Sequence, residues 1–501
     1  MYYGYFGIPL KFAPQHVDPN PNVGLVYARH VDDDITVAMA WAQAGNSMNV
    51  RIANIAASLC LALSSYTASA VELDSDGFGE VLIFPFFNAS SGWDTYIDLI
   101  FDNGVMPSML KIHVRDGDTG ALVNSFNVYQ LKTPFQDPPG HNWRAAISQD
   151  ENGNPFLTVA EGDCTVSGDF SSGETGADFQ LGAAVGTIEV YALTGGLTAE
   201  TLENVSACVD LVSRWESGGL WDTNPDAGVM GGSVGRVSGS ASLVRVEDGL
   251  SAGYSAIALN DFADSISHTA PNALSPSLSD ANPVAILPNG VEQAPSSGEG
   301  VDAVALVLSA GNNGYKPTVT NQVISASGIN ARTEWVISYP LTGYKSYRPY
   351  EVTIDNESKS CETFGLPPEN ELPTVEIRAR DREQVLVSWG GGVENRRYAI
   401  DISPEPLWDV EVALCHAVNV VAFENSPSIL LEEGSNNVYR ISNVLAKPTS
   451  SSVKWTFLEP TTMDGIGRPL VGFGLTIFEN GTLNGGSVLA NYALLKPHIR
   501  N

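Results

Sequence analysis

Short segments in which apolar and polar residues alternate recur along the chain and indicate β-strands. At residues 110–115 a leucine, an isoleucine and a valine alternate with a lysine, a histidine and an arginine. This period of two is typical of a strand with one face in a core and the other in water, so we expect His113 to be solvated. At residues 80–87 (EVLIFPFF) apolar residues follow one another almost without a break, which predicts a buried strand. The pattern favours a mainly β fold.

The same reasoning predicts strands over most of the chain after residue 80. They lie at residues 94–101, 109–115, 121–131, 145–148, 156–159, 187–193, 241–246, 333–339, 374–380, 384–389, 398–402, 410–421, 453–458, 471–478 and 486–493. Turn sequences such as DGDTG at residues 116–120 connect them. Residues 224–240, rich in glycine and serine, are expected to form a loop. Residues 204–216 predict a short helix, and residues 301–310 fit either a buried strand or a short helix, because periodicity does not separate the two.

Strands of this length and spacing are typical of β-sandwiches. We expect two disulfide-stapled, immunoglobulin-like β-sandwich domains with one or two short helices. The first would comprise residues 71–263 and the second residues 301–501. Residues 264–300 hold prolines among serine, asparagine and glycine, which predicts a linker or a surface excursion between the two domains.

Residues 48–70 have the pattern of a secretory signal peptide. Arg51 precedes an apolar run, and the segment ends in Ala-Ser-Ala, which predicts cleavage between Ala70 and Val71. The apolar run is too short to span a bilayer, which takes about 20 apolar residues. The alternative is a buried helix of the folded protein.

The 47 residues before Met48 are unexpected in front of a signal peptide, which belongs at an N-terminus. Residues 1–47 have scattered aromatics, three consecutive aspartates and no amphipathic period. We interpret this upstream extension as a start-site misassignment, with Met48 as the true start. An unusual N-terminal extension is the alternative.

The cysteines after the predicted cleavage site indicate disulfides. Cys60 leaves with the signal peptide, and the four that remain are Cys164, Cys208, Cys361 and Cys415. An even number in an exported chain is typical of a disulfide framework, for which three pairings exist. We favour Cys164–Cys208 and Cys361–Cys415, because each bond then lies within one half of the chain. No Cys-x-x-Cys spacing is present, which argues against zinc and redox sites.

The chain is strongly acidic, with 57 Asp and Glu residues against 26 Lys and Arg residues and a net charge of −31. A field of this sign repels phosphate backbones and anionic membrane surfaces, so we expect no nucleic-acid partner. No second long apolar segment follows the signal peptide, so we expect no membrane span.

Three stretches carry a family resemblance. The run G-x-G-E-V-L-I-x-P at residues 77–85, the IEV strand after Thr187, and the C-terminal G-F…N-G…V-L-A-N-Y between Gly472 and Tyr492 resemble a group of secreted bacterial proteins with no assigned activity. The resemblance runs through most of the chain after residue 70. It implies export and a β fold, and it carries no catalytic residue across.

Four patterns are candidates for chemistry, and each has a structural alternative. Residues 231–235 match G-x-S-x-G, but a nucleophile elbow needs a strand before it and a helix after it, and glycine-rich loop is expected here. Oxygen ligands for calcium could come from Asp74, Asp76 and Glu80, or from Asp116 and Asp118, although ordinary turn chemistry explains the same residues. None of the histidines is spaced as in H-x-x-x-H, and His416 beside Cys415 is expected to pack near a disulfide.

Aromatic residues near Gly218 and Gly219 offer one more binding surface. Trp215 and Trp221 flank these glycines, and exposed aromatics on a β-sandwich can stack on sugar rings, although aromatics more often fill a core. We assign no catalytic residue, no cofactor-binding residue and no metal ligand. A pair of carboxylates for glycoside hydrolysis cannot be chosen from the sequence, because it is defined by its geometry.

These observations lead to one functional expectation and one alternative. We expect an exported, non-enzymatic envelope or extracellular protein with a structural, adhesive or partner-binding role. Its partners would be other envelope proteins, further copies of the chain through strand edges, or carbohydrate. The alternative is a secreted hydrolase that acts on polysaccharide, or a carbohydrate-binding protein.

Overall fold

The structure is a computed structural model of the chain. It describes residues 23–28, 37–42, 70–101, 109–129, 142–161, 164–173, 176–198, 201, 205, 207–309, 318–323, 331–344, 352–354, 357–359, 374–380, 414, 416–423, 427–432, 435, 437–440, 451–458, 469–483 and 488–500. The chain forms two compact units, Met1–Ala68 and Ser69–Asn501. In the first unit, β1 (Val23–Ala28) pairs antiparallel with β2 (Val37–Ala42). The predicted signal peptide lies outside the described residues except for Ala70.

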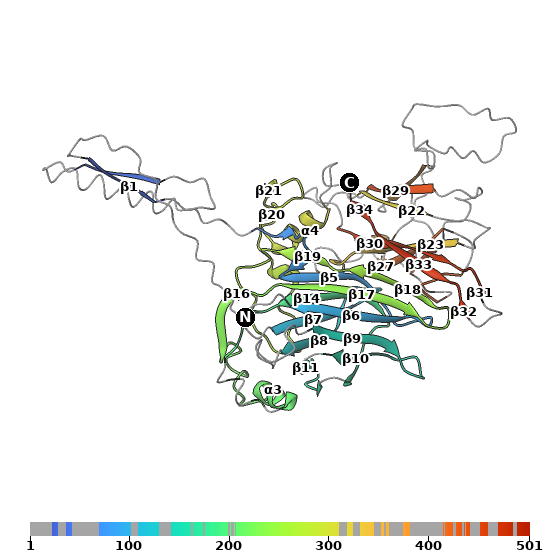
Figure 1. The fold of residues 1–501 in the computed structure, drawn as a ribbon, viewed down its shortest axis with the longest axis horizontal. Helices are drawn as coiled ribbons and strands as arrows, with labels where there is room; N and C mark the ends of the chain where they lie inside the picture. The colour runs from blue at the N-terminus through green and yellow to red at the C-terminus, as the bar shows by residue number, and fades with distance from the viewer. Residues whose placement is uncertain are drawn as a thin grey trace, which may run out of the picture. The chain divides into compact units, whose positions relative to one another are not determined.

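The second unit is built on two large antiparallel sheets (Figure 1). The seven-stranded sheet has the order β13-β10-β9-β6-β17-β18, and β4 also pairs with β17. Its strands are β4 (Phe78–Gly79), β6 (Asp94–Phe101), β9 (Asn142–Gln149), β10 (Pro155–Glu161), β13 (Asp178–Gln180), β17 (Val237–Arg245) and β18 (Leu250–Ser255).

The eight-stranded sheet has the order β12-β11-β8-β7-β14-β5-β19-β3. Its strands are β3 (Glu72–Leu73), β5 (Val81–Asn88), β7 (Met109–Asp116), β8 (Leu122–Tyr129), β11 (Cys164–Ser167), β12 (Ser172–Gly173), β14 (Val185–Ala192) and β19 (Ile257–Asn260). Strands that are neighbours in sequence, such as β7 and β8, pair through short turns, as the turn sequences predict.

The two sheets pack face to face across an apolar core. In β6 every second residue is buried, from Thr95 to Phe101, while Tyr96 and Ile100 on the other face are exposed. Leu99 of β6 and Phe84 and Val114 of the facing sheet belong to one hydrophobic cluster. Burial of alternate side chains therefore fixes the register of the seven-stranded sheet, because a slip by one residue would turn its apolar set toward water.

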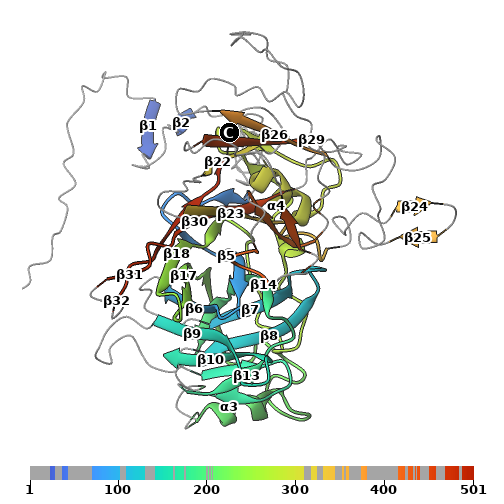
Figure 2. The same ribbon diagram turned by 90° about the vertical axis from the view of Figure 1, so that its right-hand side faces the viewer.

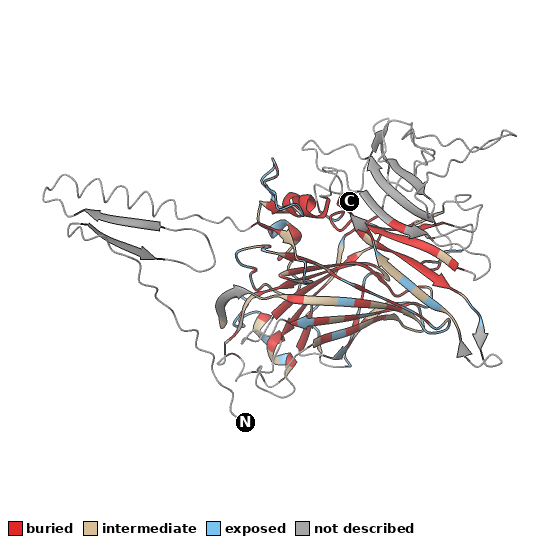
Figure 3. Cartoon of the chain, turned by 45° about the horizontal axis from the view of Figure 1, so that its top comes forward, coloured by how far each residue is buried: buried red, intermediate tan, exposed pale blue. Residues whose placement is uncertain are grey.

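The outer face of the eight-stranded sheet is covered as well, which the alternation in β7 did not predict. It packs against α3 (Cys208–Trp215), α4 (Gly300–Ser309) and the chain between β19 and α4, which includes η1 (Leu278–Asp280), β20 (Ala285–Ile286) and β21 (Glu292–Gln293). All ten residues of α4 are buried, and the helix is red throughout in Figure 3. A helix that is apolar all round has no amphipathic period, which is why the sequence left residues 301–310 undecided.

Smaller sheets follow from residue 318 onward. A five-stranded sheet has the order β28-β27-β23-β30-β33, and a four-stranded sheet has the order β26-β29-β22-β34 (Figure 2). Their strands are β22 (Thr318–Val323), β23 (Ala331–Ser338), β26 (Thr374–Arg380), β27 (Val418–Ala422), β28 (Val438–Arg440), β29 (Ser451–Leu458), β30 (Val471–Phe478), β33 (Tyr492–Pro497) and β34 (Ile499–Arg500). In the same region, two-stranded sheets pair β24 (Val352–Ile354) with β25 (Glu357–Lys359) and β31 (Thr482–Leu483) with β32 (Val488–Leu489). Earlier in the chain, β15 (Thr194–Leu197) pairs with β16 (Val229–Val234).

The five-stranded sheet shares the core of the two large sheets. Val336 of β23, Val420 of β27 and Leu475 of β30 belong to the same hydrophobic cluster as Phe84. The mainly β, antiparallel class is confirmed. The Gly- and Ser-rich residues 224–240, expected to be a loop, instead contain β16 and the start of β17. The predicted strands at residues 384–389 and 398–402 lie outside the described residues.

Candidate functional site

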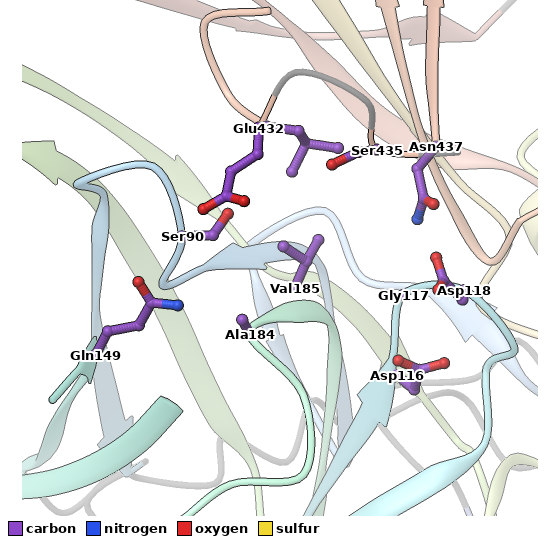
Figure 4. Close-up of a pocket in the computed structure, with 11 residues that line it drawn as sticks. Ser90, Asp116, Gly117, Asp118, Gln149, Ala184, Val185, Glu432, Ser435 and Asn437 are labelled. Atoms are coloured by element: carbon purple, nitrogen blue, oxygen red, sulfur yellow. The ribbon is translucent and has the colours of Figure 1, made fainter. Parts of the chain in front are cut away.

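A pocket of about 330 Å³ lies where the β7–β8 turn meets Leu431, Glu432, Ser435 and Asn437. Figure 4 shows it between two walls: Glu432 and Ser90 on one side, and Asp116, Asp118 and Asn437 on the other. Gln149, Gly117, Ala184, Val185, Leu431 and Ser435 complete the lining. Three carboxylates thus face one opening, and none of the lining residues that the structure describes is basic.

The wall formed by the β7–β8 turn is held by its own side chains. Asp116 Oδ1 accepts hydrogen bonds from the backbone N–H of Thr119 at 2.9 Å and from its hydroxyl at 2.7 Å. The turn also binds the second half of the chain, because the carbonyls of Gly117 and Asp118 accept from the N–H groups of Val418 (2.7 Å) and Ala417 (3.0 Å). Asp116 therefore stabilises the β7–β8 turn, which is the structural alternative considered for it, and its side chain also lines the pocket.

The opposite wall is held by a buried carboxylate on β23. Glu334 accepts hydrogen bonds from the backbone N–H groups of Ile429 (2.7 Å) and Leu430 (3.1 Å) and from the hydroxyl of Ser428 (3.0 Å). Burial raises the pKa of Glu334, and the hydrogen bond from Ile429 opposes this. The carboxylate accepts from the buried N–H of Ile429 and shares that of Leu430 with the hydroxyl of Ser428, which lies 3.3 Å away.

Side chains from the first half of the chain hold the same segment from the other side. The indole N–H of Trp93 and the guanidinium of Arg245 both donate to the carbonyl of Ile429, at 2.8 and 3.0 Å. The amide of Asn88, at the end of β5, donates to the carbonyl of Leu430. These bonds fix the backbone just before Leu431 and Glu432, so that both residues reach the pocket.

One buried residue directs a polar group into the pocket. Asn437 is only 7% exposed, and within the described part of the chain no side-chain hydrogen bond joins its amide to another residue. Figure 4 shows the amide pointing from the start of β28 toward Asp118, into the pocket. Its backbone carbonyl, in contrast, accepts from the N–H of Val420 at 2.8 Å. The residue is buried while its amide faces the pocket, so a ligand that enters the pocket can hydrogen-bond to this amide.

A second cluster of polar groups lies under the covering layer of the eight-stranded sheet. Lys111, His113 and Arg115 occupy alternate positions of β7, and all three are buried. The expectation that His113 is solvated is therefore wrong, because this face of β7 lies under the chain between β19 and α4 and under Tyr344. In the sheet, His113 stands opposite Glu189 of β14.

The charges in this cluster are paired. Arg115 Nε donates to Glu189 Oε1 at 2.6 Å, and the other oxygen of Glu189 accepts from the hydroxyl of Tyr191 at 2.7 Å. Tyr344 joins the pair, accepting from Arg115 at 2.7 Å while its hydroxyl lies 3.1 Å from both Glu189 oxygens. A buried ion pair with this many hydrogen bonds fixes the covering chain onto the sheet, which is a structural role.

The other two basic side chains of the cluster, Lys111 and His113, have lowered pKa values. Burial lowers the pKa of Lys111 to about 7, and its ammonium donates to the carbonyl of Ala270. Burial lowers the pKa of His113 well below its usual value, and the positive charges of Lys111 and Arg115 lower it further. The histidine is therefore uncharged at neutral pH.

The two tryptophans considered as a sugar platform are buried. Trp215 is 7% exposed and Trp221 is fully buried, and they pack with Tyr129 and His268 in one aromatic cluster. The hydroxyl of Tyr129 accepts from the indole N–H of Trp215 at 3.1 Å and donates to His268 Nε2 at 2.9 Å. The structure thus shows these rings filling the core, so they offer no stacking surface.

The remaining candidates have structural roles. Asp74 accepts hydrogen bonds from the N–H groups of Asp76 and Phe78 and pairs with Arg236 at 2.6 Å. Glu80 accepts from the N–H groups of Phe262 and Ala263, at 2.7 and 3.3 Å. In the described ranges, no three acidic, histidine or cysteine side chains are grouped as metal ligands. Asp74 and Glu80 therefore have structural partners in the fold.

Two further motifs are located by the structure. Ser233 of the G-x-S-x-G match lies in β16, and the next element is β17, so the strand-turn-helix of a nucleophile elbow is not formed. Cys164 and Cys208 form the expected disulfide, which joins β11 to the first residue of α3 with 5.1 Å between the Cα atoms. Cys361 and Cys415 lie outside the described residues.

Sequence reasoning found only part of the pocket. Asp116 and Asp118 were singled out by their DGD turn, but nothing near Glu432 or Asn437 marks those residues in the sequence. They reach the pocket through contacts of Glu334, Trp93 and the β7–β8 turn, which are distant in sequence. The sequence did contain a sign of the buried cluster, which we interpreted as a solvated face. Basic residues alternate along β7, and the apolar strand β14 beside it contains one glutamate, Glu189, which stands opposite His113.

No helix in the described part of the chain has both the length and the apolar character needed to cross a membrane. The chain was compared with protein-family models, with curated proteins and with solved structures, and none of the three comparisons finds a match. The resemblance to a group of secreted bacterial proteins therefore stays a prediction, and the function has to be argued from the residues of this chain alone.

Proposed function

We propose that the protein is exported and acts, without catalysis, in the cell envelope or outside the cell, in a structural, adhesive or partner-binding role. The observation that carries this proposal is the disulfide between Cys164 and Cys208. Structural disulfides form and persist in oxidising compartments and are rare in the cytosol. Both cysteines are buried in the cluster that holds α3 against the eight-stranded sheet, so the bond is part of the fold.

The predicted cleavage site supports export. The boundary between the two compact units falls at Ala68 and Ser69, next to the expected cut between Ala70 and Val71. Val71 is fully buried, its N–H donates to the carbonyl of Val284 at 2.9 Å, and its own carbonyl accepts from Ile286 at 2.9 Å. Cleavage would leave a nitrogen on Val71 that still donates, so the large unit can keep this contact.

The two described carboxyl groups whose pKa is raised by burial have structural partners. A general acid in glycoside hydrolysis needs a carboxyl group with a raised pKa at the site. Among the described residues, burial raises the pKa of Glu80 and of Glu334. Both bind backbone N–H groups, and neither lines the acid-lined pocket.

We retain the two-sandwich organisation as part of the proposal. The five-stranded and four-stranded sheets of the second half would form the second immunoglobulin-like sandwich, stapled by Cys361–Cys415. Mapping of disulfide-linked peptides by mass spectrometry tests this. A peptide pair joining Cys361 to Cys415 is expected, and free thiols at these two positions in the exported protein would contradict it.

The experiment that tests export uses the full chain with its leader, produced in a bacterium that is then separated into cytoplasm, envelope, periplasm and medium. The expected product lies outside the cytoplasm, begins at Val71 on N-terminal sequencing, and has no free thiol at Cys164 and Cys208. The variant Ala70→Gln removes the small residue before the cut and should delay cleavage. Wild-type protein that stays in the cytoplasm with its leader attached and its thiols free would refute the proposal.

One observation favours the alternative of a polysaccharide-acting hydrolase: Asp116, Asp118 and Glu432 share one pocket. Incubation of the purified protein with plant and bacterial polysaccharides, followed by an assay of released reducing sugars, separates the two functions. We expect no release. Release that is abolished in both Asp116→Asn and Glu432→Gln would establish the hydrolase instead.

A further inference from the structure

We propose that the acid-lined pocket binds a primary ammonium on an aliphatic stem, namely the lysine side chain of a partner polypeptide. The inference rests on the proposed partner-binding role and names the chemistry of the partner. Its starting point is the side chain of Asn437, a buried residue whose amide points into the pocket and makes no side-chain hydrogen bond within the described part of the chain. The amide oxygen of Asn437 can accept from a ligand N–H.

The charges around the pocket select a cation. Asp116, Asp118 and Glu432 line it, and none of the lining residues that the structure describes is basic. His416 lies beside the pocket, with Nδ1 3.7 Å from Asp118 Oδ1. A pocket with low-dielectric walls and one sign of charge concentrates ions of the opposite sign, and the net charge of −31 acts in the same direction.

The arrangement of the carboxylates suits an ammonium better than a metal ion. In Figure 4, Glu432 lies on the wall opposite Asp116 and Asp118. Within the described residues these groups do not converge as a metal site. An ammonium has three N–H donors on a flexible stem and can bind oxygens that are spread apart, whereas a metal ion needs its oxygen ligands at about 2.0–2.6 Å.

The apolar part of the pocket lining favours a ligand with an aliphatic stem. Ala184, Val185 and Leu431 lie in the lining between the polar groups, and Figure 4 shows Ala184 and Val185 between the two walls. A lysine side chain buries its methylene groups on apolar surface while the ammonium stays with polar partners. No aromatic residue is among the described lining residues, so a sugar ring finds no face to stack on. Lysine is therefore favoured over an amino sugar.

The test measures binding of small probes to the full exported chain by ligand-observed NMR and by calorimetry. The probes are Nα-acetyl-lysine methylamide, its Nζ-acetylated form, the arginine analogue, and glucosamine. We expect the lysine probe to bind with a dissociation constant on the order of 1 mM, which is reasonable for a single side chain with exposed ion pairs. Acetylation of Nζ should abolish binding, and a lysine-containing peptide should bind through the same residues.

Matched variants locate the site. Glu432→Gln should weaken binding of the lysine probe about fivefold, as expected for an exposed ion pair. Asn437→Leu, which removes the amide and keeps the size of the side chain, should weaken it by a similar factor. Glu292→Gln makes the same change in net charge on the exposed strand β21, away from the pocket, and should leave binding unchanged.

Three results would overturn the inference. They are equal binding of the Nζ-acetylated probe, tighter binding of glucosamine than of the lysine probe, and lysine binding that Glu432→Gln and Asn437→Leu leave intact. Thermal unfolding of each variant shows that it is folded. None of these results touches the export argument, which the N-terminal sequence and the thiol content decide separately.

Discussion

The carboxylate of Glu334, on β23, accepts a 2.7 Å hydrogen bond from the backbone N–H of Ile429. Glu334 is fully buried, and Ile429 belongs to the segment that places Glu432 in the acid-lined pocket. From the other side, the carbonyl of Ile429 accepts from Trp93 at 2.8 Å. The pocket wall is therefore fixed between the two halves of the chain, and the position of Glu432 depends on both.

Glu334→Ala should lower the free energy of unfolding and loosen the segment that places Glu432 in the pocket. The substitution leaves the N–H of Ile429 buried without its acceptor, at a cost of about 1–3 kcal/mol, while the N–H of Leu430 keeps the hydroxyl of Ser428 at 3.3 Å. Chemical denaturation should therefore show a loss of about 2 kcal/mol in the free energy of unfolding. Glu432→Gln is the control, because Glu432 is exposed, and it should leave stability within about 0.5 kcal/mol. Equal stability of the two variants would contradict the role given to Glu334.

Loss of the disulfide should lower stability at all pH values. The bond closes a loop with a sequence separation of 44. The chain-entropy model gives about 4 kcal/mol for a loop of this length, less any strain. Replacement of both Cys164 and Cys208 by serine should lower the denaturant midpoint accordingly. Reduction of the wild type should have the same effect, and no effect of either change would mean that the bond does not form in solution.

His268 should make the protein sensitive to mild acid. Its Nδ1 lies 2.7 Å from the carbonyl of Pro225, which can only accept, so Nδ1 carries the proton and Nε2 accepts from the hydroxyl of Tyr129. Burial lowers the pKa of His268 to about 4. Between pH 6.5 and 4 the unfolded chain binds a proton that the folded chain does not, so stability falls as the pH falls through this window. This shift corresponds to about 3 kcal/mol.

The measurement is the free energy of unfolding between pH 7.5 and 4 for the wild type and for His268→Gln. The variant should be less stable at pH 7.5, because it loses the bridge between Tyr129 and Pro225, and its stability should depend less on pH. Parallel curves for the two proteins would show that His268 does not cause the acid sensitivity.

Lys111 should also make the stability of the folded protein rise with pH, at higher pH than His268 does. Burial lowers its pKa to about 7, so above pH 7 the folded protein has lost a proton that the unfolded chain keeps up to about pH 10.5. Stability therefore rises with pH through this window, by at most about 1.4 kcal/mol per pH unit. Lys111→Met removes the buried cation and should stabilise the protein most at pH 6, relative to the wild type.

The difference between wild type and Lys111→Met, measured from pH 6 to 9.5, isolates this contribution from other titrating groups. The stabilisation by methionine should shrink steadily over the range. A constant difference would mean that the pKa of Lys111 is not lowered, and the carbonyl of Ala270 would then be the partner of a charged ammonium.

The local pattern predicted many of the longer strands, because alternation along a strand is a local property, and it did not predict most of the short ones. The spans of β6, β26 and β30 match the predicted ranges, and the positions of β7 and β14 differ from them only at their ends. The alternation in β7 led to a wrong prediction of solvent exposure. It shows that the two faces of the strand differ in polarity, but it does not show that the polar face is in contact with water. Lys111 and His113 are polar and buried, since Ala270 and the surrounding chain, over 150 residues away in sequence, cover them.

The pocket could not be predicted in this way. Its acidic turn, Asp116 to Asp118, has a local signal, because aspartate and glycine form turns. Its other wall depends on Glu334 and Trp93, which contact the backbone of Ile429 across 95 and 336 residues of sequence. No local pattern records a contact of that separation.

The sequence by itself determined the acidic charge and many of the longer strands, favoured the pairing of Cys164 with Cys208, and led to the expectation of a cut before Val71. Each of these depends on neighbouring residues, on counting or on chain distance. Only the tertiary structure decided that α4 is a fully buried helix, that Trp215 and Trp221 fill a core, and that the amide of Asn437 shares a pocket with three carboxylates. Those outcomes depend on which surfaces cover each other, and burial is a property of the packed chain.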